Sequence, residues 1–352
     1  MPVYLKEFGT VCRIKAKTNK YIVLGLTMTT NTKLTELDFL KMADTLNQSD
    51  QYRVITKYNK PEFYNLCADV PKKIGVFLDI EATGLSFTED KLIELGMVKF
   101  EYSDDGRIFR ILEEFNGYQD PKKSISAFIT ALTGISDDMV KGQKIDESAV
   151  AEYLEDVDLI IAHNAKFDRS FFEITFPNIT PKAWACSMYD INWNSEKVES
   201  HKLEYIAYKY NFFYEGHRAI IDCLVGIHIL SQELYNSKQL ALKQLLDNAM
   251  QPRFKLWAQN AAYAHKDLLR ARQYRWDTHP AHGFKAWSIE LPENQVATEI
   301  DYLKNEIYNS QINIPVDIFD AFSRFSLNSY VKQDKSKYAD KINWINGLQN
   351  AK

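Results

Sequence analysis

The chain has 352 residues, of which 45% are hydrophobic and 26% charged, as expected for a globular protein of two or three domains. No apolar run reaches the ~20 residues of a membrane span, and the first residues lack the basic-then-apolar pattern of a secretion signal. The formal net charge of −4 disfavours bulk coating of DNA, but it allows an enzyme that handles nucleic acid through a local basic patch. The four cysteines form no CxxC pair, which indicates reduced thiols in a cytosolic protein and disfavours a disulfide framework or a zinc site.

Residues 1–70 predict a small α+β extension with no catalytic constellation. Strands are expected at 10–16, 21–27 and 52–58. Thr35 is a predicted helix N-cap, with Asp38 three residues further on. We interpret this stretch as an interaction or packing domain whose partner the sequence does not name.

Two acids follow a buried strand in the central block, residues 71–238. The run 74–80 reads as a strand buried on both faces. Asp79 and Glu81 end it, and side chains two apart in a strand point the same way. Burying two neighbouring carboxylates is costly unless a cation lies between them. Since no lysine or arginine occurs at 74–90, a divalent ion with oxygen ligands is the obvious candidate. The alternative, from these residues alone, is a strand end with two solvated acids.

The rest of the central block alternates strands and helices as in an α/β unit. Strands are predicted at 92–102, 107–116, 159–162 and 183–188, and helices at 146–154, 202–210 and 219–235. The short connections between the first three strands predict antiparallel neighbours.

Further candidate site residues lie at the ends of these elements. Asn164 is a predicted N-cap, which places Asp168 in the first helical turn, where the helix dipole favours a carboxylate. Asp222 lies within the helix that begins at 219. His217 would be about 140° around a helix from Asp222, so we expect it on the preceding loop, from which it can reach across the site. Each residue alone also fits a structural role, as a dipole-compensating acid, an exposed helix acid or a surface histidine. Chance placement of all of them together is improbable.

The central block resembles the DEDDh exonucleases, the superfamily that includes the proofreading epsilon subunit of bacterial DNA polymerase III, RNase T and oligoribonuclease. The matching motifs span Asp79–Leu85, His163–Asp168 and His217–Asp222, and Leu132–Ile135 is a further likeness. One departure is Ala82, where many members have threonine. The resemblance to bacterial epsilon-like proteins of about this size covers roughly residues 50–328. It includes the runs 182–187 and 270–276 and Trp287.

The resemblance implies a ribonuclease-H-like fold, a mixed five-stranded sheet flanked by helices, with small N-terminal and C-terminal additions. It implies a 3′→5′ exonuclease that uses two Mg²⁺ or Mn²⁺ ions, about 3.5–4 Å apart in such sites. The implied metal ligands are Asp79, Glu81, Asp168 and Asp222, of which Asp79 would bridge both ions. His217 would be the general base that takes a proton from the attacking water. Contacts to the terminal nucleotide are expected from Ala82, Thr83, Gly84, Leu85, Asn164 and Phe167. For Leu85 and Phe167 the alternative is packing in the core.

Residues 239–308 interleave cations with aromatic rings, a composition that suits single-stranded nucleic acid. Candidate contacts are Arg270, Arg272, Tyr274, Arg275, Trp276 and Trp287. The alternative is a module whose rings form its own core while its arginines face solvent. Residues 309–352 are predicted as a tail with one or two short helices and no chemistry.

The leading hypothesis is an exonuclease acting on single-stranded or mismatched 3′ ends of DNA, in replication or repair, in the cytoplasm of a bacterium. One alternative is an exoribonuclease on short or single-stranded RNA, because the active-site motifs do not separate the two. Another is a nucleic-acid-binding accessory module of a polymerase with little activity. Expected partners are nucleic acid, DNA before RNA, and polymerase or repair proteins through residues 1–70, with no membrane.

Overall fold

The computed structural model describes residues 34–66, 69–327 and 335–351. The chain forms two compact units, residues 1–57 with 211–213 and residues 58–210 with 214–352. The strands predicted at 10–16 and 21–27 lie outside the described residues.

The first unit contains helix α1 (Glu36–Asn47) and a short two-stranded sheet. The predicted N-cap is confirmed, because Thr35 Oγ1 accepts the N–H of Asp38 at 3.3 Å. The Asp38 carboxylate in turn accepts the N–H of Thr35 at 2.9 Å, which completes a capping box. Strand β1 (Thr56–Lys57) pairs in parallel with β7 (Phe212–Phe213), so the strand predicted at 52–58 is much shorter than expected.

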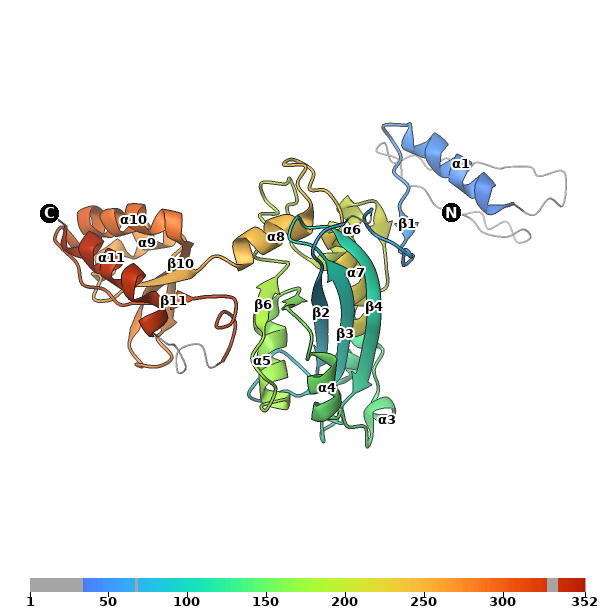
Figure 1. The fold of residues 1–352 in the computed structure, drawn as a ribbon, viewed down its shortest axis with the longest axis horizontal. Coiled ribbons are helices and arrows are strands. Elements are labelled where there is room, and N and C mark those ends of the chain that lie inside the picture. The colour runs from blue at the N-terminus through green and yellow to red at the C-terminus, as the bar shows by residue number, and fades with distance from the viewer. Residues whose placement is uncertain (1–33, 67–68, 328–334, 352) are drawn as a thin grey trace, which may run out of the picture. The chain divides into compact units, whose positions relative to one another are not determined.

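The second unit is built on a five-stranded sheet in the order β4-β3-β2-β5-β6 (Figure 1). The strands are β2 (Lys73–Ala82), β3 (Leu92–Tyr102), β4 (Ile108–Tyr118), β5 (Leu159–Ala162) and β6 (Ala183–Cys186). The first three are antiparallel neighbours, as predicted, while β5 and β6 run parallel to β2. This mixed sheet flanked by helices confirms the predicted ribonuclease-H-like fold. We call the sheet and its helices the central domain.

Helices cover both faces of this sheet. They are α2 (Ala127–Thr133), α3 (Asp137–Val140), α4 (Glu147–Tyr153), α5 (Ala165–Thr175), α6 (Leu203–Lys209), α7 (Ala219–Leu230) and α8 (Ala241–Ala249). On one face, Val76 and Leu78 of β2 pack in a core with Val150 of α4 and Phe171 of α5. On the other face, α7 lies so close that a Cβ added at Gly226 would meet the Phe77 ring at 2.2 Å.

Helix α7 is shorter than the predicted 219–235. It ends at Leu230 with Ser231 as its C-cap, and the chain then turns back through a bridge between Glu233 and Leu240. Leu234 is fully buried in that turn. Its apolar character therefore reflects burial outside the helix, although its spacing continues the helical stripe.

The C-terminal part of this unit forms an antiparallel sheet in the order β11-β8-β10-β9. The strands are β8 (Arg253–Ala258), β9 (Arg275–Thr278), β10 (Lys285–Pro292) and β11 (Val316–Phe319). The helices are α9 (Lys266–Ala271) after a 3₁₀ turn (Tyr263–His265), α10 (Glu293–Tyr302) with a π-helical extension (Leu303–Tyr308), and α11 (Ala339–Asn350) after a 3₁₀ turn (Lys335–Tyr338). The stretch predicted as a tail thus supplies the expected helix and also strand β11. The boundary at 308 stays a prediction, although β11 pairs with β8 across it.

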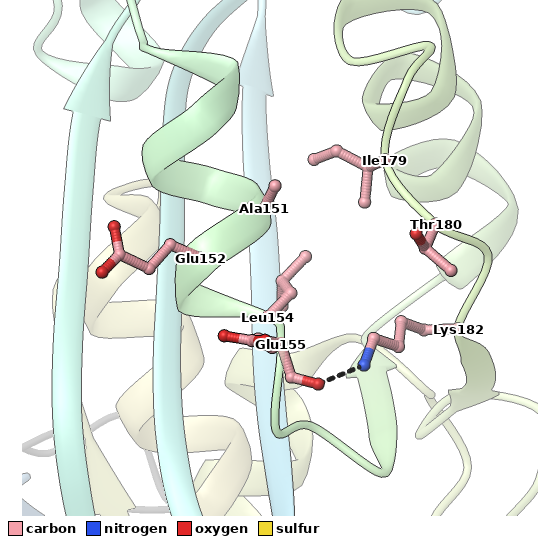
Figure 2. Close-up of a pocket in the computed structure, with 7 residues that line it drawn as sticks. All are labelled: Ala151, Glu152, Leu154, Glu155, Ile179, Thr180 and Lys182. Atoms are coloured by element: carbon pink, nitrogen blue, oxygen red, sulfur yellow. Dashed lines mark hydrogen bonds between the residues drawn. The ribbon is translucent and has the colours of Figure 1, made fainter.

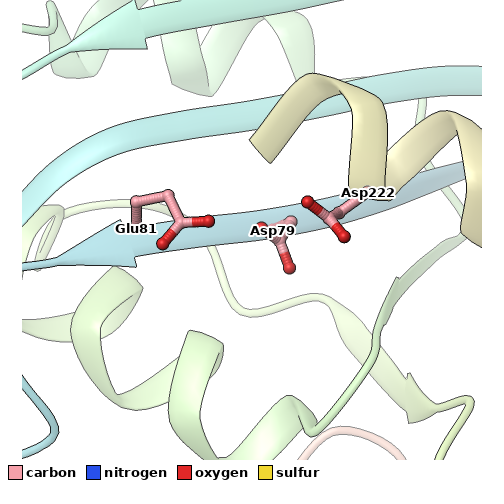
Figure 3. A group of neighbouring side chains, drawn as sticks. All are labelled: Asp79, Glu81 and Asp222. Atoms are coloured by element: carbon pink, nitrogen blue, oxygen red, sulfur yellow. The ribbon is translucent and has the colours of Figure 1, made fainter. Parts of the chain in front are cut away.

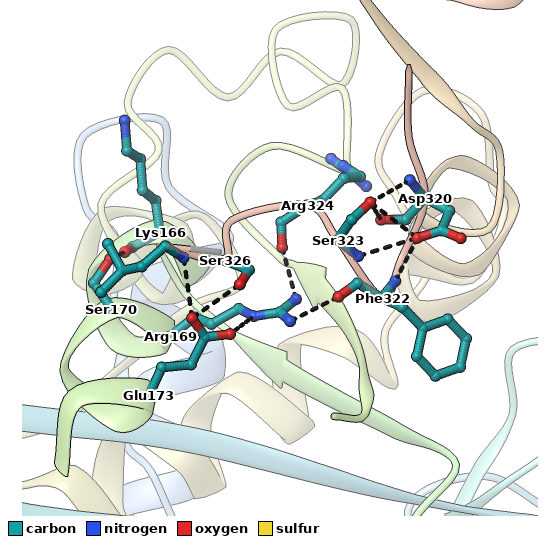
Figure 4. A network of polar contacts seen from close by, with 10 residues as sticks. Lys166, Arg169, Ser170, Glu173, Asp320, Phe322, Ser323, Arg324 and Ser326 are labelled. Atoms are coloured by element: carbon teal, nitrogen blue, oxygen red, sulfur yellow. Dashed lines mark hydrogen bonds and ion pairs between the residues drawn. The ribbon is translucent and has the colours of Figure 1, made fainter. Parts of the chain in front are cut away.

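After β11, residues 320–327 lie against the central domain (Figure 4). The backbone N–H of Trp184, in the edge strand β6, donates to the carbonyl of Ala321 at 2.8 Å. Arg169 of α5, 2% exposed, donates to the carbonyls of Phe322 and Arg324, each at 2.7 Å. The backbone of 320–327 therefore satisfies a buried guanidinium and one N–H at the sheet edge.

The same segment is fixed by two carboxylates of the central domain. Glu173 of α5 accepts the N–H of Leu327 at 3.0 Å and pairs with Arg169 at 2.8 Å. Arg324 pairs with Asp190, which follows β6.

In the part of the chain that the structure describes, no helix has the length and apolar character to cross a membrane.

Candidate functional site

Two acids at the end of β2 point toward the start of α7. Side chains alternate along a strand, and Phe77 faces α7. Asp79 and Glu81 are therefore on the same face as Phe77. Asp79 lies opposite Gly96 in β3, and Glu81 lies opposite Glu94. The central strand β2 thus brings two partly buried carboxylates to the end of the sheet where α7 begins.

Asp222 joins these two acids from the first turn of α7 (Figure 3). One carboxylate oxygen from each of Asp79, Glu81 and Asp222 lies within 4.8 Å of the others. The Asp222 carboxylate accepts the Tyr214 hydroxyl at 2.9 Å and the Arg218 N–H at 3.1 Å. We call these three acids the acidic group.

Basic side chains next to the acidic group are paired elsewhere. His217 lies 3.5 Å from Glu204, and Arg218 lies 3.2 Å from Glu94. Among the described residues, no ion pair involves Asp79, Glu81 or Asp222. Three converging carboxylates without an ion pair of their own are the oxygen donors that a hard divalent cation prefers. The residues present therefore fit a divalent metal ion.

Asp168 approaches the same strand end from the first turn of α5. It is 2% exposed, and its Oδ1 accepts the N–H of Ile80 at 3.1 Å. Because Ile80 lies between Asp79 and Glu81, this bond holds Asp168 beside the acidic group. Its oxygens are not among the three that lie within 4.8 Å of one another. The structure thus brings three of the four predicted ligands together and places the fourth alongside.

Burial raises the pKa of all four carboxyl groups, and neighbouring acids raise it further. Burial, followed by repulsion from Asp222 and Glu94, raises the pKa of Glu81 from 4.5 to about 8. Burial raises the pKa of Asp222 from 3.8 to about 6, against hydrogen bonds from Tyr214 and Arg218 that lower it. The pKa values of Asp79 and Asp168 are raised well above 3.8, chiefly by burial and then by neighbouring acids. A bound cation would remove this repulsion, so the electrostatics favour metal binding.

His217 lies on the loop before α7, as predicted, and its backbone is strained. Its φ of 64° is in the left-handed region, which is costly for a residue with a Cβ. The imidazole is 44% exposed and lies 3.5 Å from the Glu204 carboxylate. A Cβ added at Gly216 would meet the same Glu204 at 3.2 Å and Asp222 at 3.7 Å. The loop therefore passes directly beside the acidic group.

One acid at this site was not singled out from the sequence. Glu94 of β3 is fully buried. Its Oε1 accepts Arg218 Nη2 at 3.2 Å and Asn116 Nδ2 at 3.1 Å, and its Oε2 accepts the Ala219 N–H at 3.2 Å. Arg218 Nη2 also donates to the Tyr118 hydroxyl at 2.6 Å. The signal in the sequence is a lone acid inside the apolar run of 92–98.

Comparison with known proteins identifies this domain. Residues 76–230 match the RNase_T family, described as an exonuclease. The chain is 28% identical over 169 residues to the PolC-type DNA polymerase III of Listeria innocua, covering 46% of this chain and 11% of that protein. It is 30% identical over 183 residues to the PolC-type enzyme of Caldanaerobacter subterraneus, covering 48% of this chain and 12% of that protein. Over residues 76–230 the central domain therefore resembles the RNase_T exonucleases. The chain spans only a small part of the length of these relatives.

Solved structures similar to this exonuclease domain include the nuclease domain of 3′hExo, a DEDDh family member, bound to rAMP. That likeness has 20% identity and a TM-score of 0.40, and covers 49% of this chain and 97% of the other. An Escherichia coli ExoI–ssDNA complex covers 79% of this chain and 72% of its own, with 13% identity and a TM-score of 0.42.

The residues predicted to contact the terminal nucleotide are distributed around the acids of the exonuclease domain. Ala82 is 6% exposed at the end of β2, and Leu85 on the following loop is 87% exposed. Between them, Thr83 Oγ1 donates to Asp90 at 3.0 Å. A Cβ at Gly84 would meet the same Asp90 at 2.4 Å, so a side chain there would displace this carboxylate.

The other two predicted contacts flank Asp168. Asn164 is the N-cap of α5 as predicted, but its φ is 84° and its side chain makes no capping hydrogen bond. Phe167 is partly buried against the central core, with its ring 4.8 Å from that of Phe171. Core packing therefore accounts for part of the Phe167 side chain, whereas Leu85 is open to solvent.

The six candidate contacts of the C-terminal sheet differ in exposure. Tyr274 and Trp287 are 3% and 8% exposed and belong to the hydrophobic core, where their faces are covered. Arg272 binds the buried Glu299 through two nitrogens. Four candidates are exposed at the surface, and of these only Arg272 makes the ion pair just described: Arg270, Arg272, Arg275 and Trp276. The core alternative therefore describes Tyr274 and Trp287, and an exposed edge strand carries Arg275 and Trp276.

A separate pocket lies at the other end of the parallel strands (Figure 2). It has a volume of about 410 Å³ and lies between α4 and the segment before β6. Lys182 reaches across it and donates to the carbonyl of Glu155 at 2.8 Å. The residues that line it come before β5 and β6, whereas Asp79 and Glu81 lie in the last residues of β2, at the opposite end of the sheet, so the pocket is not part of the acidic site.

Proposed function

We propose that the exonuclease domain removes nucleotides one at a time from single-stranded or mismatched 3′ ends of DNA and releases nucleoside 5′-monophosphates. The observation that carries this proposal is the acidic group of Asp79, Glu81 and Asp222, with Asp168 beside it, in a domain that resembles the DEDDh exonucleases. The bacterial relatives are PolC-type DNA polymerases III, which supports DNA as substrate and the bacterial cytoplasm as location.

Two Mg²⁺ or Mn²⁺ ions, when bound, would neutralise the phosphate, lower the pKa of the attacking water and stabilise the leaving oxygen. Asp79, Glu81 and Asp222 would hold them, and Asp168 would complete the ligand set. Strand β2 presents two of these carboxylates in a fixed orientation. Tyr214 and the Arg218 N–H fix the third, because they occupy both Asp222 oxygens and so orient that carboxylate.

His217 is the proposed general base. Its loop passes beside Asp222, and its imidazole is accessible to solvent and therefore to substrate. Glu204 at 3.5 Å can hold the ring and stabilise the imidazolium that forms when it takes a proton.

Leu85 is the proposed wedge against the terminal base, because it is 87% exposed on the loop that follows the two strand acids. Ala82, Thr83 and Gly84 would present backbone to the terminal nucleotide, and Asn164 and Phe167 would border it from α5. Arg270, Arg275 and Trp276 would contact the upstream strand, since guanidinium groups bind phosphates and an indole face stacks on a base. Polymerase or repair partners of residues 1–70 also belong to this proposal, supported by the polymerase relatives alone.

The decisive experiment digests end-labelled single-stranded DNA, duplex DNA with a mismatched 3′ end, and RNA, each with Mg²⁺, Mn²⁺ or EDTA. We expect stepwise shortening from the 3′ end, lost in EDTA and fastest on DNA. Faster shortening of RNA would select the exoribonuclease alternative. No shortening of any substrate by the folded protein would overturn the proposal and favour the accessory module.

Matched variants test whether the acidic group is responsible. Asp79→Asn retains the shape of the side chain but removes a charged oxygen, so we expect loss of at least about 100-fold in kcat. Asp104→Asn is the control, because Asp104 lies on the turn after β3 and pairs with Lys73 at the other end of β2. It should retain wild-type activity.

A further inference from the structure

Glu94 is a buried acid whose oxygens are fully engaged by protein donors. Oε1 accepts from Arg218 and Asn116, and Oε2 accepts from the Ala219 N–H. Its position beside Glu81 suggests a metal ligand at first sight. Glu94 is not part of the acidic group, however, because its oxygens do not converge with those of Asp79, Glu81 and Asp222. Its contacts point instead to the start of α7.

Two of the three residues that donate to Glu94, Arg218 and Ala219, are the N-cap and the first residue of α7. His217 directly precedes them, and Asp222 lies one turn later, where its carboxylate accepts the Arg218 N–H. The short backbone segment 217–222, which we call the α7 start, therefore joins His217, the proposed base, to Asp222, a proposed metal ligand. Any shift of the α7 start therefore moves both His217 and Asp222.

The α7 start packs closely against β3. A Cβ added at Gly96 would meet the Ala219 carbonyl carbon at 2.6 Å and the Ile220 nitrogen at 2.7 Å. The start of α7 thus lies directly on the strand, two residues from Glu94. Tyr118 of β4 accepts the same Arg218 nitrogen at 2.6 Å, so the guanidinium is held between two strands.

We propose that Glu94 is a positioning residue of the exonuclease. By holding Arg218 and the Ala219 N–H, it sets where Asp222 and His217 lie. This inference rests on the proposed function for its catalytic consequence, but not for its effect on metal affinity. A buried ion pair usually adds little stability compared with apolar residues of the same volume, so placement is the better account of this pair. Groups that orient metal ligands typically contribute 10–100-fold to metal affinity or activity.

The test is Glu94→Gln, compared with Glu101→Gln at the other end of β3. A glutamine has the shape of the native side chain, but either orientation of its amide turns an NH₂ toward a donor. Glu101 is also ion-paired, to Arg110 and Lys72, but lies far from α7 along the strand. Each variant is assayed for Mn²⁺ affinity by titration without nucleic acid, for kcat and KM on labelled DNA at saturating Mn²⁺, and for unfolding in urea.

We expect Glu94→Gln to weaken Mn²⁺ affinity about 10-fold or more and to lower kcat about 10-fold, with KM changed less than about threefold. Glu101→Gln should change none of these quantities. Wild-type Mn²⁺ affinity and wild-type kcat in Glu94→Gln, with only a lower urea midpoint, would show a purely structural role and overturn the inference. If the wild type shortens no nucleic acid, the proposed function fails, and the Mn²⁺ titration still decides this inference.

A second variant separates positioning from direct ligation. Arg218→Met removes the guanidinium that Glu94 holds and leaves every carboxylate in place. If Glu94 acts through the start of α7, Arg218→Met reproduces the Mn²⁺ defect, and the double variant is little worse than either single variant. An unchanged Mn²⁺ affinity in Arg218→Met, or full additivity in the double variant, would contradict the inference.

Discussion

Arg324 Nη2 lies 2.7 Å from Asp190 Oδ1, and both side chains are at most 4% exposed. The other Asp190 oxygen accepts the N–H of Cys186 at the end of β6. Arg324→Met would leave the Asp190 carboxylate buried without its counter-charge. We expect a loss of about 3–5 kcal/mol in the free energy of unfolding, measured in urea at neutral pH. Arg270→Ala, an exposed control, should change stability by less than about 0.5 kcal/mol. A loss below about 1 kcal/mol in Arg324→Met would show that the pair is solvated in solution.

Two glycines in helices should respond in opposite ways to alanine. A Cβ at Gly226 of α7 would lie 2.2 Å from the Phe77 ring, and none of the described atoms lies within 4 Å of a Cβ at Gly347 of α11. Gly226→Ala should therefore destabilise the protein by about 1–3 kcal/mol through overpacking, despite the better helix propensity of alanine. Gly347→Ala should stabilise it by up to about 1 kcal/mol. Thermal unfolding of both variants checks the pair, and a stabilised Gly226→Ala would contradict the close packing of α7 on β2.

The metal-free protein should lose stability as pH rises from 5 to 8. The pKa of Glu81 is raised to about 8 and that of Asp222 to about 6, so the folded state binds more protons than the unfolded state over this range. The free energy of unfolding then falls with pH until both groups are ionised in both states. Thermal unfolding in EDTA at pH 5 and pH 8 measures the slope, which should be smaller in Glu81→Gln. Mg²⁺ should raise the melting temperature more at pH 8 than at pH 5, since protons no longer compete. Equal pH slopes for wild type and Glu81→Gln would refute the assignment.

His217→Asn should separate the imidazole from the loop conformation. Asparagine tolerates the left-handed backbone better than most residues, so the φ of 64° can be retained. We expect kcat to fall by about 10²–10⁴, with Mn²⁺ affinity and KM for DNA nearly unchanged. Activity at several pH values with saturating Mn²⁺ makes the measurement. A parallel fall in metal affinity would assign the residue to the metal site instead of proton transfer.

The fold was predictable because its strands carry strong local signals. The apolar runs at 92–102 and 159–162 match β3 and β5 residue for residue. Asp79 and Glu81, near the end of β2, lie on the same face as Phe77 because side chains alternate along a strand. The family likeness also predicted the gathering of Asp79, Glu81 and Asp222, which come from elements more than a hundred residues apart in the chain.

What the sequence did not predict depends on long-range packing. Glu94 looks misplaced in an apolar strand until Arg218 and the Ala219 N–H arrive from another element. Tyr274 and Trp287 alternate with arginines, and composition does not say which way a ring faces. The end of α7 was missed because Leu234 has helical spacing but is buried in a turn.

The hydrogen bond from Trp184 to Ala321 has a consequence for shortened versions of the chain. Strand β6 is the last of its sheet, and residues 320–327 lie along its outer side. A protein ended before residue 320 would retain every acid of the site but would present an uncovered apolar strand to its neighbours in solution. Such bare edges pair with one another. A minimal nuclease cut at that point should therefore self-associate, and a polar or proline substitution on β6 would be needed to keep it monomeric.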